Sequence, residues 1–164
     1  METIILDAKS LKLTFSKENG ALVGMEAGET GWVIHRREEL GLSWRLLVPV
    51  SEELRDNPVY GEKQTLSSWE RTEDGLRFVW DGVESERAGR LSIKIVVEVR
   101  VEGEQAVWYT RVENQSPYIV ESVYSPYVGD LTHPEGCDWF KGFIYSYATA
   151  REWDIYPTFS THEG

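Results

Sequence analysis

The sequence predicts an all-β protein, an antiparallel β-sandwich that folds as one domain over residues 1–164. Three observations lead to this prediction: apolar residues recur mainly with period two, turn-forming residues separate the apolar runs, and stretches with helical periodicity are nearly absent. Period two places apolar side chains on one face of a strand and leaves the alternate residues for solvent or a second layer. Short strands separated by regularly spaced turns are typical of sandwiches.

The N-terminal part predicts a hairpin and then a single strand. Apolar and polar residues alternate over residues 11–16, and Asn19-Gly20 supplies a turn before the apolar run 21–23. The same alternation over residues 44–50 predicts the next strand. Residues 51–55 are the one helix candidate, a single turn at most.

A second hairpin is predicted from residues 66–71 and 76–80, which flank the segment Thr72-Glu73-Asp74-Gly75. Asp-Gly is a common pair in tight reversals, because glycine adopts a positive φ without steric cost. We therefore expect Asp74-Gly75 to supply the positive φ of this turn.

The strongest strand signal lies in the second half of the chain. Six apolar residues alternate with mostly polar ones, which predicts a long central strand: Leu91, Ile93, Ile95, Val97, Val99 and Val101. Residues 106–112 carry large groups on both faces, so we expect that strand to be covered on both sides. Two further strands are predicted at residues 118–123 and 143–147.

The tail differs from the rest of the chain, because residues 139–159 contain eight aromatic residues. So much apolar surface needs a cover. We expect residues 139–164 either to fold back on the sandwich or to form a connection to a missing domain or an interface segment.

Charge and cysteine content exclude several classes of partner. The 17 basic and 28 acidic residues give a net charge of −11, which repels phosphate backbones, so nucleic acid is not expected as a partner. The lone Cys137 cannot form an internal disulfide, which favours a cytoplasmic location. The chain shows no signal peptide and no apolar run long enough for a membrane span, so no membrane partner is expected; a signal peptide removed earlier would imply secretion.

No pattern of catalytic or metal-binding residues stands out, so we expect no catalytic residue, no metal and no cofactor. Residues 130–138 hold the acidic and histidine residues Asp130, His133, Glu135 and Asp138, but their spacing matches no calcium loop and indicates a solvated turn. Cys137 is not expected to be a nucleophile, because no helix is predicted whose N-terminus would lower the pKa of its thiol. Glu152 and Asp154 are the best local carboxylate pair for glycoside hydrolysis, although a solvated strand edge is the favoured interpretation.

The aromatic content makes carbohydrate a conceivable ligand. The sequence contains 7 Trp and 8 Tyr, and sugar rings stack on flat aromatic faces. Strand register assigns Trp44, Trp80 and Trp108 to the core. Four aromatic residues near predicted turns are the candidates for sugar contact: Trp32, Trp139, Trp153 and Tyr156.

Several strand and turn motifs between about residues 5 and 131 carry a family resemblance. They are Leu11-x-Leu-x-Phe15, Asn19-Gly20-x-Leu22, Trp44-Arg45-Leu46, Leu76-x-Phe-x-Trp80, Trp108-x-x-x-Val112-x-Asn114-x-Ser116 and Ser125-Pro126. This series resembles the N-terminal β-sandwich domain of a glycoside hydrolase, of the supersandwich class related to galactose mutarotase. The resemblance implies a domain that packs against a catalytic (β/α)-barrel, contributes a loop to its sugar site, and leaves the catalytic carboxylates to that barrel.

Three functions follow as expectations. The first is a non-catalytic accessory domain or subunit of a carbohydrate-active enzyme, structural and able to contact sugar, with a catalytic barrel domain or subunit as its partner. The second is a stand-alone lectin-like module, and the third is a small mutarotase-like or glycosidase enzyme. A second copy of the chain is a further candidate partner, because the aromatic tail offers a surface for self-association.

Overall fold

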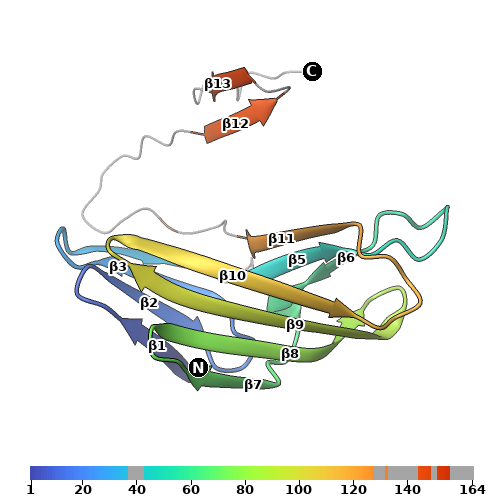
Figure 1. The fold of residues 1–164 in the computed structure, drawn as a ribbon, viewed down its shortest axis with the longest axis horizontal. Coiled ribbons are helices and arrows are strands. Elements are labelled where there is room, and N and C mark those ends of the chain that lie inside the picture. The colour runs from blue at the N-terminus through green and yellow to red at the C-terminus, as the bar shows by residue number, and fades with distance from the viewer. Residues whose placement is uncertain (37–42, 128–131, 133–143, 149–150, 156–164) are drawn as a thin grey trace.

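The computed structural model describes residues 1–36, 43–127, 132, 144–148 and 151–155, and in the last two segments only the backbone (Figure 1). Apart from a 3₁₀ turn, η1 (Gly61–Lys63), every regular element in the described part of the chain is a β-strand. All strand pairs are antiparallel. The predicted fold class, an all-β antiparallel sandwich, is confirmed.

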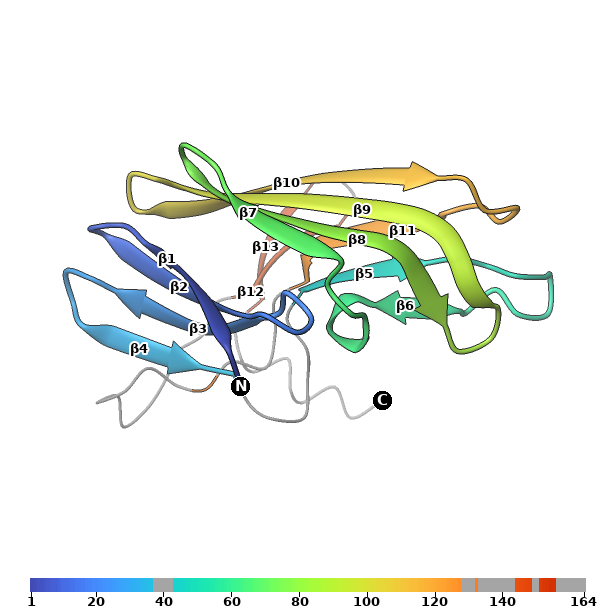
Figure 2. The same ribbon diagram turned by 90° about the horizontal axis from the view of Figure 1, so that it is seen from below.

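One layer of the sandwich is a long four-stranded sheet. It has the order β10-β9-β8-β7, with bounds β7 (Ser68–Arg71), β8 (Gly75–Ser85), β9 (Gly89–Glu102) and β10 (Gln105–Asn114). A bulge between Asp81 and Val83, with Gly82 at a φ of 82°, interrupts the β8–β9 register. A bulge bends its strand and increases the local twist, and β8 and β9 curve toward the second layer near this end (Figure 2).

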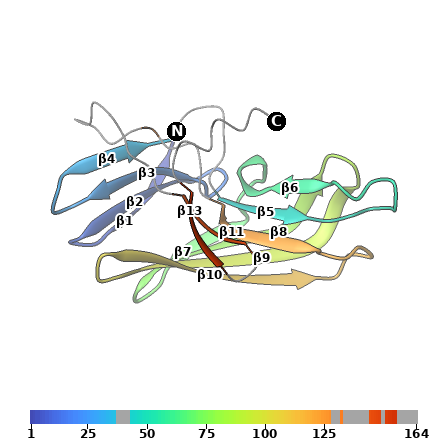
Figure 3. The same ribbon diagram turned by 90° about the horizontal axis from the view of Figure 1, so that it is seen from above.

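The second layer consists of two smaller sheets that lie side by side (Figures 2 and 3). The first has the order β1-β2-β3-β4, with bounds β1 (Thr3–Asp7), β2 (Leu11–Ser16), β3 (Leu22–Ala27) and β4 (Trp32–His35). The second has the order β11-β5-β6, with bounds β5 (Ser43–Leu47), β6 (Pro58–Tyr60) and β11 (Ser122–Tyr127). A hairpin of β12 (Ile144–Ala148) and β13 (Arg151–Ile155) pairs with itself.

The core fills the space between the layers and draws on all three sheets. The first five alternating residues of β9 are at most 4% exposed and Val101 is half-buried, so the predicted central strand is confirmed. Opposite them, Trp44 and Leu46 of β5 and Leu13 and Phe15 of β2 are at most 2% exposed. Burial of such side chains contributes about 2 kcal/mol each, which makes this core the main source of stability.

Hydrogen bonds tie the layers together at both edges. Along one edge, the Arg71 guanidinium donates to the Ile5 carbonyl at 2.7 Å, which joins β7 to β1. Along the other, the hydroxyls of Thr110 in β10 and Ser125 in β11 lie 2.7 Å apart. The two smaller sheets are therefore each fixed to the long sheet.

The turn at Asn19-Gly20 is confirmed and is also a packing feature. Gly20 has a φ of 71°, and a Cβ at this position would lie 2.6 Å from the Trp80 ring. The Trp80 indole N–H donates to the Asn19 carbonyl at 3.2 Å. Only glycine combines this φ with this close approach.

The predicted turn at Asp74-Gly75 is present, but its expected mechanism is wrong. Gly75 is not among the glycines with positive φ, and a Cβ there would lie 2.0 Å from the Val99 carbonyl oxygen. Glycine is required because the backbones of β8 and β9 approach closely, a condition that depends on the neighbouring strand.

Two other expectations are corrected by the structure. The strand at residues 106–112 is not covered on both sides, because its outer face is open to solvent at Tyr109, which is 48% exposed. Residues 51–55 form a reversal instead of a helical turn: the Leu54 N–H donates to the Ser51 carbonyl, and the Val50 N–H donates to the Leu54 carbonyl.

The strand predicted at residues 118–123 begins only at Ser122. Side-chain bonds hold the segment before it in a turn, since Asn114 Nδ2 donates to the Tyr118 carbonyl at 2.7 Å and the Tyr118 N–H donates to Ser116 Oγ at 3.3 Å. Such local bonds compete with strand pairing.

Gln64 fixes the end of β6 to the long sheet. Its side-chain amide donates to the carbonyls of Tyr60 and Glu84, both at 3.1 Å, and accepts from the Glu84 N–H at 2.7 Å. Gln64 is only 6% exposed, so each of these bonds satisfies a polar group that is shielded from water. The position of Tyr60 therefore depends on this residue.

Candidate functional site

The outer face of the β11-β5-β6 sheet carries a row of Tyr60, Arg45 and Tyr124, which we call the tyrosine–arginine row. Arg45 of β5 pairs with Tyr60 of β6 on one side and with Tyr124 of β11 on the other. Directly paired residues of adjacent strands point to the same face of a sheet. Because Trp44 and Leu46 on either side of Arg45 point into the core, the alternation directs Arg45 outward.

The guanidinium of Arg45 lies between the two tyrosine rings. Its Cζ is 5.5 Å from the centroid of the Tyr60 ring and 5.6 Å from the centroid of the Tyr124 ring. Both distances are within the range of cation–π attraction, which contributes about 0.5–1 kcal/mol for each ring at an exposed site. The two rings therefore hold the cation in a defined place.

Arg45 has no anionic partner in the part of the chain that the structure describes. No ion pair or hydrogen bond of its guanidinium to a described residue is present, and its buried Nε has no hydrogen-bond partner. The chain as a whole has a net charge of −11. A half-buried cation without a counter-ion is unusual in so acidic a protein, because burial of a charge costs free energy unless the charge is paired.

A second cation lies at the other end of the row. Lys63 Nζ is 5.3 Å from the centroid of the Tyr60 ring and forms an ion pair with Glu86 at 2.7 Å. The hydrogen bond between the two side chains raises the pKa of Lys63 and lowers the pKa of Glu86. Lys63 is thus neutralised, whereas Arg45 has no acidic partner among the described residues.

A glycine supports the row from behind. A Cβ on Gly61, the residue after Tyr60, would lie 2.6 Å from Ser43 Oγ and 2.7 Å from the Trp44 ring. Only a residue without a side chain allows η1 to pack this closely on β5. The backbone that carries Tyr60 is therefore held against the strand that carries Arg45.

The row combines the two features that a sugar-binding surface needs. Tyr124 is 48% exposed and offers an aromatic surface for the C–H groups of a sugar ring. The Arg45 guanidinium offers N–H donors for hydroxyl or carboxylate oxygens. Rings and donors lie on adjacent strands, so one small ligand can reach both.

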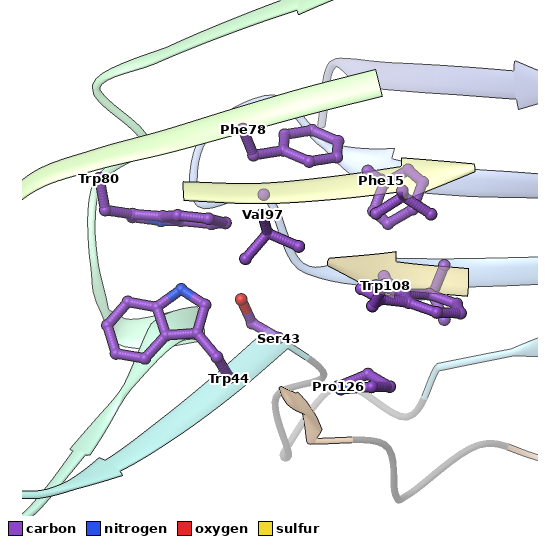
Figure 4. Close-up of a pocket in the computed structure, with 11 residues that line it drawn as sticks. Phe15, Ser43, Trp44, Phe78, Trp80, Val97, Trp108 and Pro126 are labelled. Atoms are coloured by element: carbon purple, nitrogen blue, oxygen red, sulfur yellow. The ribbon is translucent and has the colours of Figure 1, made fainter. Parts of the chain in front are cut away.

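The interior of the sandwich does not compete as a ligand site. A cavity of about 20 Å³ lies between the layers, lined by aromatic and aliphatic residues that include Trp44, Trp80 and Trp108 (Figure 4). That volume is the size of one water molecule and far below the roughly 300–1,000 Å³ of ligand pockets. This cavity is therefore too small to hold a sugar.

The outer face of the long sheet carries two adjoining hollows of about 500 and 370 Å³ that share Asp81 and Lys94. Charged side chains dominate their lining, and Trp69, which is 37% exposed, lies at the margin of one. Cations and carboxylates in this lining pair with one another, as in Arg77 with Glu70 at 2.9 Å. This surface has one aromatic residue in the hollows and no stacked pair of rings around a cation.

Of the four aromatic residues predicted to contact sugar, the structure describes the side chain of one. Trp32 is 49% exposed at the start of β4, outside the tyrosine–arginine row. Trp153 lies in β13 opposite Ser146, where only the backbone is described. Trp139 and Tyr156 lie outside the described residues. The prediction for all four residues stays a prediction.

The other candidates from the sequence lie mostly beyond what the structure describes. Residues 130–138, apart from Thr132, are outside the described residues, and so are the cluster and the cysteine that they contain. Glu152 and Asp154 occupy alternate positions of β13. Within the described residues there is no group of three or more side chains placed to hold a metal, and no helix with the length and hydrophobicity of a membrane span.

Sequence reasoning missed Arg45, Tyr60 and Tyr124 as a group. One signal was present, because Arg45 occupies the polar position of an apolar alternation and must point away from Trp44 and Leu46. The tyrosines gave no signal, since strand pairing across the sequence decides which residues flank the arginine.

Known proteins give no further guide to this surface. Comparisons of the chain with models of protein families, with curated proteins and with solved structures each found no match. The function therefore has to be argued from the fold and the surface geometry.

Proposed function

We propose that this chain is a non-catalytic carbohydrate-binding β-sandwich that serves as an accessory domain or subunit of a carbohydrate-active enzyme. The observation that carries the proposal is the tyrosine–arginine row, in which Tyr60 and Tyr124 flank a cation that has no acidic partner among the described residues. Aromatic rings that flank hydrogen-bond donors on a rigid sheet favour sugar rings over extended apolar ligands.

A pair of matched variants tests sugar binding. Tyr124 and Tyr109 are both 48% exposed and both stack with an arginine, but they lie on outer faces of different sheets. In ¹H–¹⁵N NMR titrations with a panel of methyl glycosides, we expect Tyr124→Ala to weaken binding about tenfold, because one stacked ring is lost. Tyr109→Ala should bind like the wild type.

Equal losses in the two variants would contradict the assignment of the site to the tyrosine–arginine row. No chemical-shift change with any glycoside would contradict sugar binding altogether. Melting temperatures of both variants separate a binding defect from a folding defect.

The absence of catalysis is tested with the same chain. Purified protein incubated with aryl glycosides and free aldoses should match the buffer blank, because no set of acid, base and nucleophile was recognised in the sequence. Turnover that disappears when a single carboxylate, such as Glu152, is replaced by its amide would overturn this part of the proposal.

An accessory role is supported by exposed apolar residues in and just before β11. Ile119 is 76% exposed, Val123 is 45% exposed and Tyr127 is 37% exposed. Val123 pairs with the core residue Leu46, so it lies on the opposite face of β11 from Tyr124. A folded catalytic domain of the same enzyme is the partner that would cover such apolar residues. The isolated chain should then bind a hydrophobic dye, and the double variant Ile119→Ser, Val123→Ser should bind less of it. Equal dye binding by the two proteins would argue for a stand-alone lectin-like module.

A further inference from the structure

We infer that the sugar recognised by the tyrosine–arginine row carries a carboxylate, as a hexuronate does, and that the Arg45 guanidinium binds that carboxylate. This inference rests on the proposed function and names its ligand class. It starts from a feature that a neutral sugar does not explain, which is a cation without an acidic partner in the described part of a chain with a net charge of −11.

The geometry leaves one part of the guanidinium for a ligand. The Tyr60 and Tyr124 rings lie near it on two sides, with ring centroids 5.5 and 5.6 Å from Cζ, and Nε is buried. The two terminal nitrogens, Nη1 and Nη2, remain to meet a ligand, and together they form a two-pronged donor edge. A carboxylate matches such an edge with two parallel N–H···O bonds.

The charge of the chain selects among anions. Highly charged ligands such as polyphosphates are repelled by the net charge of −11, whereas a single carboxylate adds one negative charge next to one unpaired positive charge. The remaining ring of a hexuronate presents C–H groups, which can stack on the exposed part of the Tyr124 ring. One hexuronate residue thus uses both the arginine and a tyrosine.

The alternative use of Arg45 is structural, as a clamp that joins two strands through its stacked rings. That role requires the charge and the rings but no free donor edge. A clamp would therefore be insensitive to the ligand's carboxylate, which gives the experiment its readout.

The test compares two ligands that differ only at C6. The full chain is titrated by NMR with methyl β-glucuronide and with methyl β-glucoside, and acetate and methyl glucoside 6-sulfate serve as separate probes of the anion. We expect the glucuronide to bind about tenfold more tightly than the glucoside, because it adds hydrogen bonds between charged groups. Arg45→Gln should remove this preference, Arg45→Lys should restore only part of it, and Arg100→Gln should leave it unchanged.

Each other outcome decides between the two proposals. Equal binding of glucuronide and glucoside, lost in both cases with Tyr124→Ala, would overturn the carboxylate inference and leave sugar binding in place. Acetate that binds as tightly as the glucuronide, or a sulfate that binds more tightly, would overturn the hexuronate as ligand. No binding of any probe would overturn both proposals.

Discussion

Two arginines stack on exposed tyrosines in this protein, and their surroundings are opposite. On the outer face of the long sheet, Arg100 lies 5.1 Å from the Tyr109 ring centroid and pairs with Glu98 at 3.0 Å. On the outer face of the β11-β5-β6 sheet, Arg45 lies between two tyrosine rings and has no acidic partner among the described residues. The same residue types therefore build two different surfaces.

The charges around Arg100 are paired with one another. The hydrogen bond to Glu98 raises the pKa of Arg100, and Asp74 adds a second carboxylate at 3.8 Å. Arg77 joins the same network through Glu70 and Glu98. An anion that approaches Arg100 must displace carboxylates that are already bound, whereas no carboxylate of the described residues is bound to Arg45. Arg45 is therefore the better candidate for recognition.

The two surfaces are outer faces of sheets that pack on one shared core. Val97→Asp disrupts that core and should have the largest effect of the variants. Val97 is 4% exposed in the central strand β9 and lines the interior cavity. A buried unpaired carboxylate should cost several kcal/mol and unfold the domain. The measurement is urea denaturation followed by tryptophan fluorescence. A soluble variant that melts like the wild type would show that the two layers are not joined through this strand.

Gln64→Ala should have the next largest effect and should reach only one of the two faces. It removes three hydrogen bonds between Gln64 and the backbone of Tyr60 and Glu84, at a cost of about 2 kcal/mol. We expect the NMR signals around Tyr60 to shift and those around Tyr109 to stay in place. Equal shifts at both tyrosines would mean that the amide supports the whole sandwich and not the row in particular.

Replacing each arginine by methionine separates a paired cation from an unpaired one. Arg100→Met removes ion pairs and a ring contact, so it should lower the free energy of unfolding slightly. Arg45→Met loses ring contacts but also removes an uncompensated charge, and its stability should lie within about 0.5 kcal/mol of the wild type. A larger loss for Arg45→Met in chemical denaturation would identify this arginine as a structural clamp.

The smallest expected effect concerns pH and the cation at the end of the row. Lys63 lowers the pKa of Glu86 below its ordinary value of 4.5, so the stabilisation by this pair is complete above that value and is lost as the pH falls through the lowered pKa. The wild type should melt slightly above Glu86→Gln at pH 7, and the difference should vanish in strong acid. A difference that persists unchanged at pH 2 would show that the glutamate acts by packing.

Much of the fold was predictable because local patterns dictate it. The alternation in β9 identified a central strand, since six apolar residues on one face must meet a core. Asn19-Gly20 identified a hairpin, because that dipeptide adopts positive φ at little cost. Trp44 and Trp80 were correctly assigned to the core from their register, and both are 1% exposed.

Expectations that depended on a neighbouring strand failed more often. Gly75 was expected to serve a positive φ, but the carbonyl of Val99 on the adjacent strand is what excludes a side chain there. The strand at residues 106–112 was expected to be covered on both faces, but its outer face is open to solvent and Tyr109 is exposed there. Neither the close approach nor the open face can be read from the local sequence.

The sequence by itself determined the all-β class, the hairpins, the central strand and the outward direction of Arg45, because each depends on residues that are close along the chain. Only the tertiary structure decided that Tyr60 and Tyr124 flank that arginine and that no described acid pairs with it. Antiparallel pairing of β5 with β6 and with the distant β11 brings the three side chains into one row. Such pairing is selected by the fold as a whole, because a register is stable only when the opposite faces of the same strands fill the core.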